Sequence, residues 1–283
     1  MSSRYIVAAL SALLVLPAAL RAQTKALEYT TVDPTFETGG RLSVGLDWAI
    51  VPKKLSLKLE EEVRLTDNFS TLKRSYTTLG LEGKVLPWMK VGVGASFIMN
   101  QSPKGEWTPR FRPFAEVTLS TKADRWKLSL RERLHSTYDS SVNVYQEPML
   151  AWALKSRVKV SYDIRHSPLT PYASAELRTT LNAVNPAYFV YTTSDGRWAG
   201  TSPVYNDVYI NRLRLSAGVT CKTKHRNELD IFLVSDLNWD LDIDFNSSGK
   251  QKKDSSYSSG YAPYLFLEDS CFLGIGISYT FKL

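Results

Sequence analysis

Few side chains in this sequence have the types and spacing that could do chemistry, and the best placed of them surround one histidine. His135 is followed by Ser136 and then by Asp139. Hydrolysis by a serine nucleophile needs a histidine base and an orienting polar group within hydrogen-bond reach of one another. His135 and Ser136 are adjacent in a segment that alternates like a β-strand, so their side chains point to opposite faces. We therefore expect a packed histidine and no catalytic residues, with a lipid- or lipopolysaccharide-modifying enzyme as the alternative.

Cofactor and nucleic-acid chemistry find no support in the sequence. The two cysteines, Cys221 and Cys271, are too few for a disulfide framework and lack the spacing of metal ligands. Cys221 alternates in phase with apolar neighbours, which favours a small residue on the apolar face over half of a disulfide. No phosphate-binding loop, dinucleotide fingerprint or metal cluster is present. The net charge of +7 is spread out, without a basic block that would grip nucleic acid. We expect no cofactor, no metal and no nucleic-acid partner.

The elements that position these residues are predicted to be strands, because apolar side chains recur on every second residue from about residue 40 onward. The last thirteen residues, CFLGIGISYTFKL, place Leu273, Ile275 and Ile277 on one face and only small or polar residues between them. The same period predicts eleven clear strands, over residues 40–50, 54–65, 74–82, 86–98, 110–120, 125–137, 148–165, 171–181, 208–221, 227–239 and 264–283. Residues 26–32, ALEYTTV, are the candidate for a twelfth strand, antiparallel to the first and last of these, with ten strands as the alternative.

The predicted connections alternate between short and long along the whole chain. Outer-membrane barrels have tight periplasmic turns and longer outer loops, whereas a soluble all-β fold has no physical reason to sort its loops. We therefore predict an all-β fold, a transmembrane antiparallel up-and-down β-barrel of about 12 strands whose apolar faces meet lipid. A soluble sandwich is the alternative. The short connections are 51–54, 82–85, 121–124, 166–170 and 222–227, and the long ones are 66–73, 100–109, 138–146, 182–207 and roughly 242–261.

The N-terminus predicts export. Residues 1–22 have an early cation at Arg4, an apolar run from Tyr5 to Leu20, and small residues before the cleavage point. No later apolar run approaches the ~20 residues that a transmembrane helix needs. The predicted organisation is a cleaved signal peptide at 1–22 and one barrel domain at 23–283, in the bacterial outer membrane. The partners expected there are outer-membrane lipid and lipopolysaccharide, and the barrel-assembly machinery during insertion, with the oligomeric state left open.

Charged side chains of both signs share the polar face of the predicted strands, which in a barrel is the lumen. Opposite charges on neighbouring strands would form a salt-bridged core that fixes register, or would line a narrow selective pore. We favour the salt-bridged core, because interleaved signs neutralise one another. Glu61 and Glu132 fall in phase with the apolar face instead, which a position at the membrane rim or a β-bulge would explain. The predicted lumen-lining residues are Lys58, Glu60, Glu62, Arg64, Arg112, Glu116, Arg131, Arg133, Arg157, Asp163, Glu176, Arg178, Arg212 and Arg214.

Three stretches resemble one family of outer-membrane barrels, called domain of unknown function 2490. LSVGLDWAIVPKKLSLKLEEEVRLTDN (42–68) is similar to its opening hairpin and RVKVSYDIRHSPLTPYASAEL (157–177) to an inner hairpin. GIGISYTFKL resembles its closing strand, where Tyr279, Phe281 and Leu283 form the predicted C-terminal assembly strand. The family more usually has an aromatic residue at the position of Leu283. The resemblance covers nearly the whole mature chain, implies an outer-membrane barrel, and supplies no catalytic residues.

These observations together predict a non-enzymatic, porin-like barrel that offers a narrow pore or a loop-based binding surface. The competing hypotheses are the lipid-modifying enzyme, which would use the outer rim, and a soluble periplasmic β protein. An occluded lumen would disfavour free diffusion through the barrel.

Overall fold

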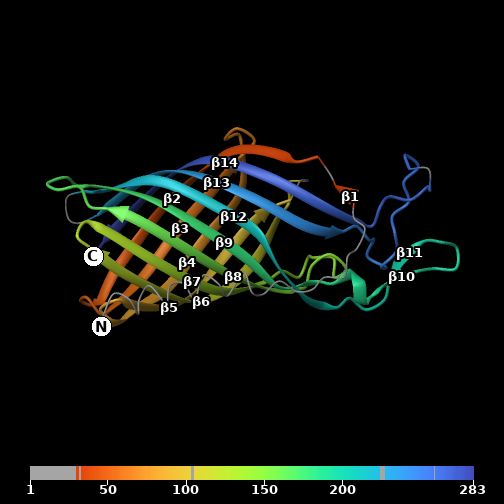
Figure 1. The fold of residues 1–283 in the computed structure, drawn as a ribbon, viewed down its shortest axis with the longest axis horizontal. Coiled ribbons are helices and arrows are strands. Elements are labelled where there is room, and N and C mark those ends of the chain that lie inside the picture. The colour runs from red at the N-terminus through yellow and green to blue at the C-terminus, as the bar shows by residue number, and fades with distance from the viewer. Residues whose placement is uncertain (1–29, 32, 103–104, 224–226, 258) are drawn as a thin grey trace.

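The computed structural model describes residues 30–283 except 32, 103–104, 224–226 and 258, and most of these lie in β-strands (Figure 1). The predicted signal peptide at 1–22 lies outside the described residues. Among the described residues no helix is long and apolar enough to cross a membrane. In chain order the elements are β1 (Thr30–Thr31), β2 (Thr35–Val51), β3 (Leu55–Thr66), β4 (Thr71–Leu86), β5 (Met89–Gln101), β6 (Trp107–Ala123), β7 (Trp126–Tyr138), β8 (Leu150–Tyr162), β9 (Leu169–Val184), the 3₁₀-helix η1 (Pro186–Tyr188), β10 (Val190–Thr192), β11 (Trp198–Gly200), β12 (Tyr205–Lys222), β13 (Glu228–Ile243) and β14 (Leu265–Lys282).

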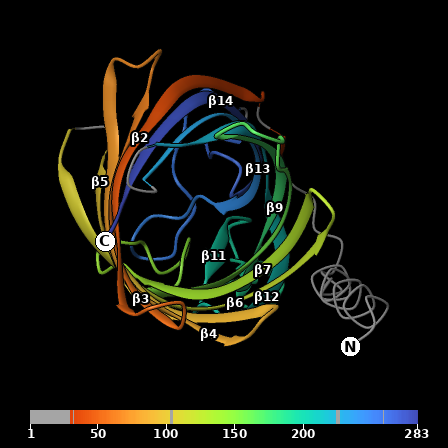
Figure 2. The ribbon, with the colours of Figure 1, turned by 90° about the vertical axis from the view of Figure 1, so that its left-hand side faces the viewer.

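Within the described part of the chain, eleven long strands close into one barrel, seen end-on in Figure 2. Neighbouring strands from β2 to β14 pair antiparallel, and the small β10–β11 hairpin forms a separate sheet. β14 then pairs with β2 in parallel, from Ser270 beside Thr35 to Lys282 beside Asp47. The predicted up-and-down barrel is therefore confirmed, with an exception at its seam. An odd number of alternating strands leaves the first and last pointing the same way, so closure has to be parallel.

The predicted antiparallel twelfth strand at residues 26–32 is corrected by the structure where it is described. Thr30 and Thr31 form β1, which pairs with Phe266 and Leu267 of β14 in parallel. β1 therefore lies along the same edge of β14 as β2 and is not inserted between them. Pro34 separates β1 from β2, because proline has no N–H to give to a sheet ladder. The described sheet has twelve strands, but eleven of them close the barrel, whereas bacterial single-chain barrels usually have an even number.

The connections at the two ends of the barrel differ in length, and Figure 1 shows the longest ones at the end opposite the C-terminus. The prediction of a long loop at 66–73 is wrong, because β3 and β4 are joined by a tight turn at 67–70. In this turn Asp67, Asn68 and Phe69 all have positive φ, at 50°, 55° and 69°. The turns at the C-terminal end span residues 52–54, 87–88, 124–125, 163–168 and 223–227, and the connections at the other end span 67–70, 102–106, 139–149, 185–204 and 244–264.

The two faces of the barrel wall differ in chemistry. In β14, Leu273, Ile275 and Ile277 are 46%, 47% and 42% exposed, and in β2 Leu42 and Val44 point outward in the same way. Each of the eleven described barrel strands exposes large apolar side chains on this outer face. A soluble sandwich would bury these faces against each other, so the structure contradicts that alternative.

The three longest loops pack into one unit, which we call the loop cap and define as residues 139–149, 185–204, 244–257 and 259–264. Asn143 Nδ2 donates to the carbonyl oxygen of Phe245 at 2.9 Å, and the Tyr205 hydroxyl donates to that of Val144 at 2.9 Å. These hydrogen bonds and an apolar cluster beneath the loop cap hold the three loops together. The apolar cluster consists of Val184, Phe189, Ile243, Phe245 and Leu265.

Candidate functional site: the charged lumen

Buried ion pairs join strands along the wall in the middle of the lumen, and the first group of them centres on Asp236. Arg214 Nε and Nη2 donate to its two carboxylate oxygens at 2.6 and 2.8 Å, and Arg41 Nη2 donates at 2.7 Å. Arg214 and Asp236 are direct cross-strand partners on β12 and β13, whereas Arg41 comes from β2 on the far side of β14. Two-pronged guanidinium–carboxylate contacts are among the stronger hydrogen bonds in proteins. One carboxylate therefore joins strands on both sides of the barrel seam.

The second group centres on Glu176 of β9, which is 4% exposed. Its Oε2 accepts a hydrogen bond from Arg131 at 2.9 Å and its Oε1 accepts one from Arg212 at 3.4 Å. Arg214 lies 3.9 Å away and thereby connects Glu176 to the Asp236 group. The two groups form one continuous network of buried charges.

Two further carboxylates form ion pairs on the lumen wall, and Glu116 is joined to the network by Arg131 at 3.9 Å. Glu116 pairs with Arg133 at 2.6 Å, and Glu62 pairs with Arg64 at 2.6 Å. Both arginines also lie over aromatic rings, 4.2 and 4.3 Å from the ring centroids, which favours a cation. We call the whole network the ionic belt, and it consists of Arg41, Glu62, Arg64, Glu116, Arg131, Arg133, Glu176, Arg212, Arg214 and Asp236.

Most of the residues predicted to line the lumen are brought together in the ionic belt. Arg178 lies toward the loop end instead, and Arg112 Nε donates to Thr137 Oγ1 at 2.8 Å. Asp163 follows the end of β8, so it lies at the mouth of the barrel and not within the wall. Those in the belt are Glu62, Arg64, Glu116, Arg131, Arg133, Glu176, Arg212 and Arg214, and those lining a cavity at the short-turn end include Lys58, Glu60, Arg157 and Asp163.

A row of four cations crosses four neighbouring strands, and two of them, Arg133 and Arg212, belong to the belt. Arg133 stands opposite Lys155, Lys155 opposite Arg178, and Arg178 opposite Arg212. Like charges directly opposite each other destabilise a sheet. Lys155 and Arg178 form no salt bridge with any described residue. The middle of the lumen therefore has an excess of positive charge. Lys155 was missed in the sequence, although it alternates in phase with Arg157.

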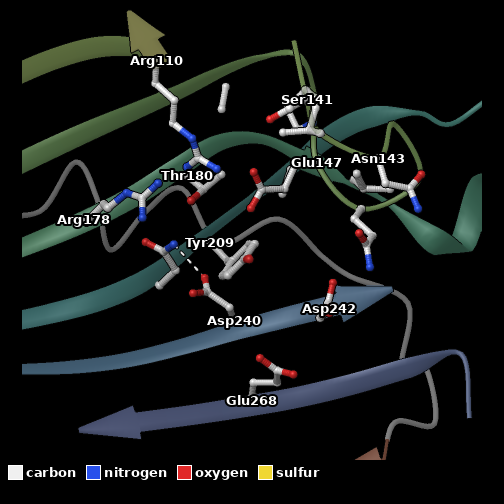
Figure 3. Close-up of a pocket in the computed structure, with 17 residues that line it drawn as sticks. Arg110, Ser141, Asn143, Glu147, Arg178, Thr180, Tyr209, Asp240, Asp242 and Glu268 are labelled. Carbon is white, nitrogen blue, oxygen red and sulfur yellow. Dashed lines mark hydrogen bonds between the residues drawn. The ribbon is translucent and has the colours of Figure 1, made fainter. Parts of the chain in front are cut away.

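A cavity of about 490 Å³ lies between the belt and the loop cap, and we call it the outer chamber (Figure 3). Arg110 of β6 and Arg178 of β9 lie on one side of it. Asp240 and Asp242 of β13 and Glu268 of β14 lie on the other side, and Asp240 is directly opposite Glu268. The outer chamber therefore has one cationic wall and one acidic wall.

Glu147 of the loop cap projects between the two walls (Figure 3). Burial raises the pKa of Glu147, although the nearby Arg110 and Arg178 favour its ionised form. Arg110 also forms an ion pair with Asp139, and Asn211 Nδ2 donates to Asp240 at 2.8 Å. The acidic wall was missed because the strand was predicted to end at residue 239. The acids at 236, 240 and 242 continue its alternation and could have revealed it.

A second cavity, of about 630 Å³, opens at the short-turn end, and we call it the inner vestibule. Among the described residues, only polar and charged side chains line it, and Lys and Arg outnumber Asp and Glu ten to five. Glu82 is shared there by Lys58 at 3.0 Å and Lys90 at 2.8 Å. In the described lining of the outer chamber, by contrast, Asp and Glu outnumber Arg four to two, so the two ends of the lumen differ in the sign of their formal charge.

The ionic belt lies between the two cavities, which have no described lining residue in common. On β9, Tyr172 lines the inner vestibule, Arg178 lines the outer chamber, and Glu176 lies between them. On β13, Asp236 occupies the equivalent middle position. The barrel thus has two chambers of opposite charge with buried ion pairs between them.

A comparison of the sequence with protein-family models identifies the family of this chain. The family model described as "Protein of unknown function (DUF2490)" matches residues 42–242. This chain belongs to the DUF2490 family. The matched region runs from β2 almost to the end of β13 and so includes most of the ionic belt. No curated protein and no solved structure matches the chain.

The hydrolytic arrangement considered from the sequence is not assembled in this DUF2490 barrel. His135, Ser136 and Asp139 are each at most 5% exposed. One Asp139 oxygen accepts hydrogen bonds from the N–H and hydroxyl of Ser141, at 2.9 and 2.6 Å, and the other pairs with Arg110. Among the described residues no hydrogen bond joins His135 to Ser136 or Asp139, and no group of three or more His, Cys, Asp or Glu could hold a metal.

Two carboxylates of the DUF2490 barrel lie on its outer face, in the middle of strands β3 and β7. Glu61 accepts a hydrogen bond from Thr77 at 2.6 Å, and Glu132 accepts one from Ser156 at 2.6 Å. Strand register continues without a shift through both positions, so the β-bulge explanation is wrong. Each carboxylate instead has a hydroxyl partner on the next strand.

The predicted C-terminal assembly strand forms the seam of the barrel. Tyr279 and Phe281 make an edge-to-face ring contact with centroids 4.8 Å apart. Leu283 N–H donates to the carbonyl oxygen of Asp47 at 3.0 Å, which extends the pairing with β2. The cysteines, Cys221 and Cys271, are both free.

Proposed function

We propose that this protein is a non-enzymatic integral barrel of the bacterial outer membrane, closed to free diffusion, that binds a small polar solute at its loop end. The observation that carries the proposal is the ionic belt between the outer chamber and the inner vestibule. A general diffusion pore needs a continuous water column, whereas the belt sets buried and mutually paired side chains such as Glu176 and Asp236 between the two cavities.

Insertion into a membrane is supported by the contrast between the two faces of the wall. Leu273, Ile275 and Ile277 are more than two-fifths exposed, whereas Glu176 and Asp236 face inward and are buried. Exposing apolar surface to water costs about 25 cal/mol per Å², and a barrel exposes it all the way round. Hydrocarbon removes that cost, so an apolar outer band and a polar interior are what a transmembrane barrel requires.

Closure is supported by the geometry of the belt. Arg41 and Arg214 both bind Asp236, and Arg131 and Arg212 both bind Glu176. A hydrated ion that crossed the belt would separate buried opposite charges, which costs several kcal/mol when no other partner replaces them. We therefore favour binding at the loop end over a porin-like pore.

Solute binding is supported by the outer chamber, which has charges of both signs on opposite walls. The loop cap beside it is held by its apolar cluster and by the hydrogen bond from Asn143 to Phe245. A preformed cavity binds with less loss of conformational entropy than a mobile loop does. Arg178 is free of salt bridges among the described residues and so can receive an anionic group, while Asp240 and Glu268 can receive a cationic one.

The experiment is conductance in planar bilayers, after heat-modifiable migration has shown that the refolded protein is a barrel in detergent. We expect no stable conductance from wild type and ion conduction from the double variant Glu176→Gln/Asp236→Asn, which breaks the belt. Glu106→Gln, at an exposed loop position, is the matched control and should behave as wild type does. Stable conductance of the wild type would contradict a closed lumen.

The same preparation tests the non-enzymatic part of the proposal. We expect no hydrolysis of phospholipid or lipopolysaccharide by wild type. Hydrolysis that is lost in His135→Ala, while the barrel still shows heat-modifiable migration, would establish the lipid-modifying enzyme instead.

A further inference from the structure

We propose that the inner vestibule is a binding site for a small soluble polyanion that carries phosphate groups or several carboxylates. In the part of the chain that the structure describes, ten Lys or Arg and five Asp or Glu line this cavity of about 630 Å³. The inference goes beyond the proposed function, because it concerns the opposite end of the lumen and holds whatever the outer chamber binds.

The carboxylates of the inner vestibule do not balance its cations. Glu82 is already shared by Lys58 and Lys90, at 3.0 and 2.8 Å. Glu116 likewise forms ion pairs with two arginines of the ionic belt. Each of these carboxylates neutralises one charge and faces two, so positive charge remains uncompensated around the cavity.

Three cations on the adjacent strands β7 and β8 are left without a carboxylate. Lys127, Arg157 and Lys159 line the cavity, and none of them forms a salt bridge with a described residue. Arg157 stands directly opposite Arg131, and its Nε is buried without a hydrogen-bond partner in the described structure. Lys159 Nζ lies over the ring of Tyr172, 3.5 Å from its centroid. A bound anion would relieve the repulsion and supply the missing acceptor.

Hydroxyl groups alternate with these cations. Ser129 stands opposite Lys159 and Ser161 stands opposite Lys127, and both serines line the inner vestibule. Ammonium, guanidinium and hydroxyl donors around one cavity suit an oxyanion with several acceptor oxygens. The described lining of the vestibule includes no aliphatic side chain, so acyl chains have no apolar contacts there. We therefore infer a water-soluble anion and not the headgroup of a lipid.

The test is calorimetric titration of the refolded barrel in a non-ionic detergent with inorganic pyrophosphate, citrate and spermidine. We expect saturable binding of pyrophosphate that weakens in 0.5 M salt, because salt screens exposed charges. Lys127→Gln/Lys159→Gln should raise the Kd at least tenfold. Lys127→Gln alone should raise it severalfold, and this side chain is exposed enough for the variant to fold. Lys253→Gln, at an exposed position in the loop cap, is the matched control and should bind as wild type does.

The other arms identify the ligand class or overturn the site. Preference for pyrophosphate over citrate assigns phosphate groups, and equal binding assigns polyanions by charge alone. Tighter binding of spermidine, no saturable binding of either anion, or an unchanged Kd in both lysine variants would overturn the proposal. Binding only to vesicles that contain phosphatidylglycerol, without binding of pyrophosphate, would also overturn it and assign a lipid headgroup. Conductance of the same samples reports on the closed lumen separately.

Discussion

Replacing Glu176 by glutamine removes the carboxylate that holds three guanidiniums in the ionic belt. Arg131, Arg212 and Arg214 lie 2.9, 3.4 and 3.9 Å from its oxygens, and the side chain is almost completely buried. Two charges 4 Å apart interact by about 4 kcal/mol at an effective dielectric constant of 20, and the lost desolvation cost of the carboxylate offsets part of this. Removing one partner of a buried ion pair costs about 3–5 kcal/mol in proteins. We expect the free energy of unfolding to fall by that amount.

Urea unfolding of the refolded barrel, followed by tryptophan fluorescence and gel migration, measures this loss. Glu106→Gln is the control for removal of an exposed carboxylate and should change the free energy of unfolding by less than about 0.5 kcal/mol. Glu176→Gln/Arg131→Gln should be less destabilised than the sum of its single variants, because it removes one of the uncompensated cations. If Glu176→Gln and Glu106→Gln have the same free energy of unfolding, water solvates the charges of the belt and these charges do not close the lumen.

Three further changes have predictable effects on stability. Gly276→Ala should cost about 1–3 kcal/mol in urea unfolding, because its Cβ would lie 2.1 Å from an aromatic ring carbon, whereas Gly83→Ala, with no atom closer than 3.9 Å, should be tolerated. Burial raises the pKa of Glu147, so the folded protein favours the protonated side chain over the ionised one. The stability that this side chain contributes is therefore lost as the pH rises above about 4.3, the usual pKa of glutamate. Glu147→Gln should slow amide exchange in the loop cap at pH 7 and match wild type at pH 3. Asp240→Asn should raise the free energy of unfolding by about 0.2–1 kcal/mol in urea unfolding, because Asp240 faces Glu268 across the strand pair.

The sequence was sufficient to predict the barrel and most of the ionic belt, because both follow from the period-two alternation. Glu176, Arg212 and Arg214 alternate with apolar residues, and closing the sheet places them inside. Strand direction at the seam was not predictable in this way. Whether the N-terminal segment pairs with β14 parallel or antiparallel depends on contacts more than 200 residues apart, as between Thr35 and Ser270. Local alternation contains no information about such contacts.

The outer chamber was harder to predict than the belt for a related reason. Asp240 and Asp242 continue the alternation of β13, with Leu241 and Ile243 keeping the apolar phase, but three aspartates within five residues look like the start of a polar loop. Long strands at the loop end are stabilised by the apolar cluster under the loop cap, in which Phe189 and Phe245 meet although they are far apart in the chain. Tertiary packing extends these strands, and it is this extension that forms the acidic wall.

The parallel seam and the ionic belt depend on each other. Arg41 of β2 passes over the ring of Phe272 in β14, 5.6 Å from its centroid, to reach Asp236 of β13. A slip of one residue between β2 and β14 would turn Arg41 to the outer face, because successive strand residues point to opposite sides. In the proposed membrane an arginine on the lipid face costs about 2–4 kcal/mol at the bilayer midplane, and Asp236 would lose one of its two partners as well. The charges in the lumen therefore specify the register of a closure that hydrogen bonding between β2 and β14 would allow in more than one position.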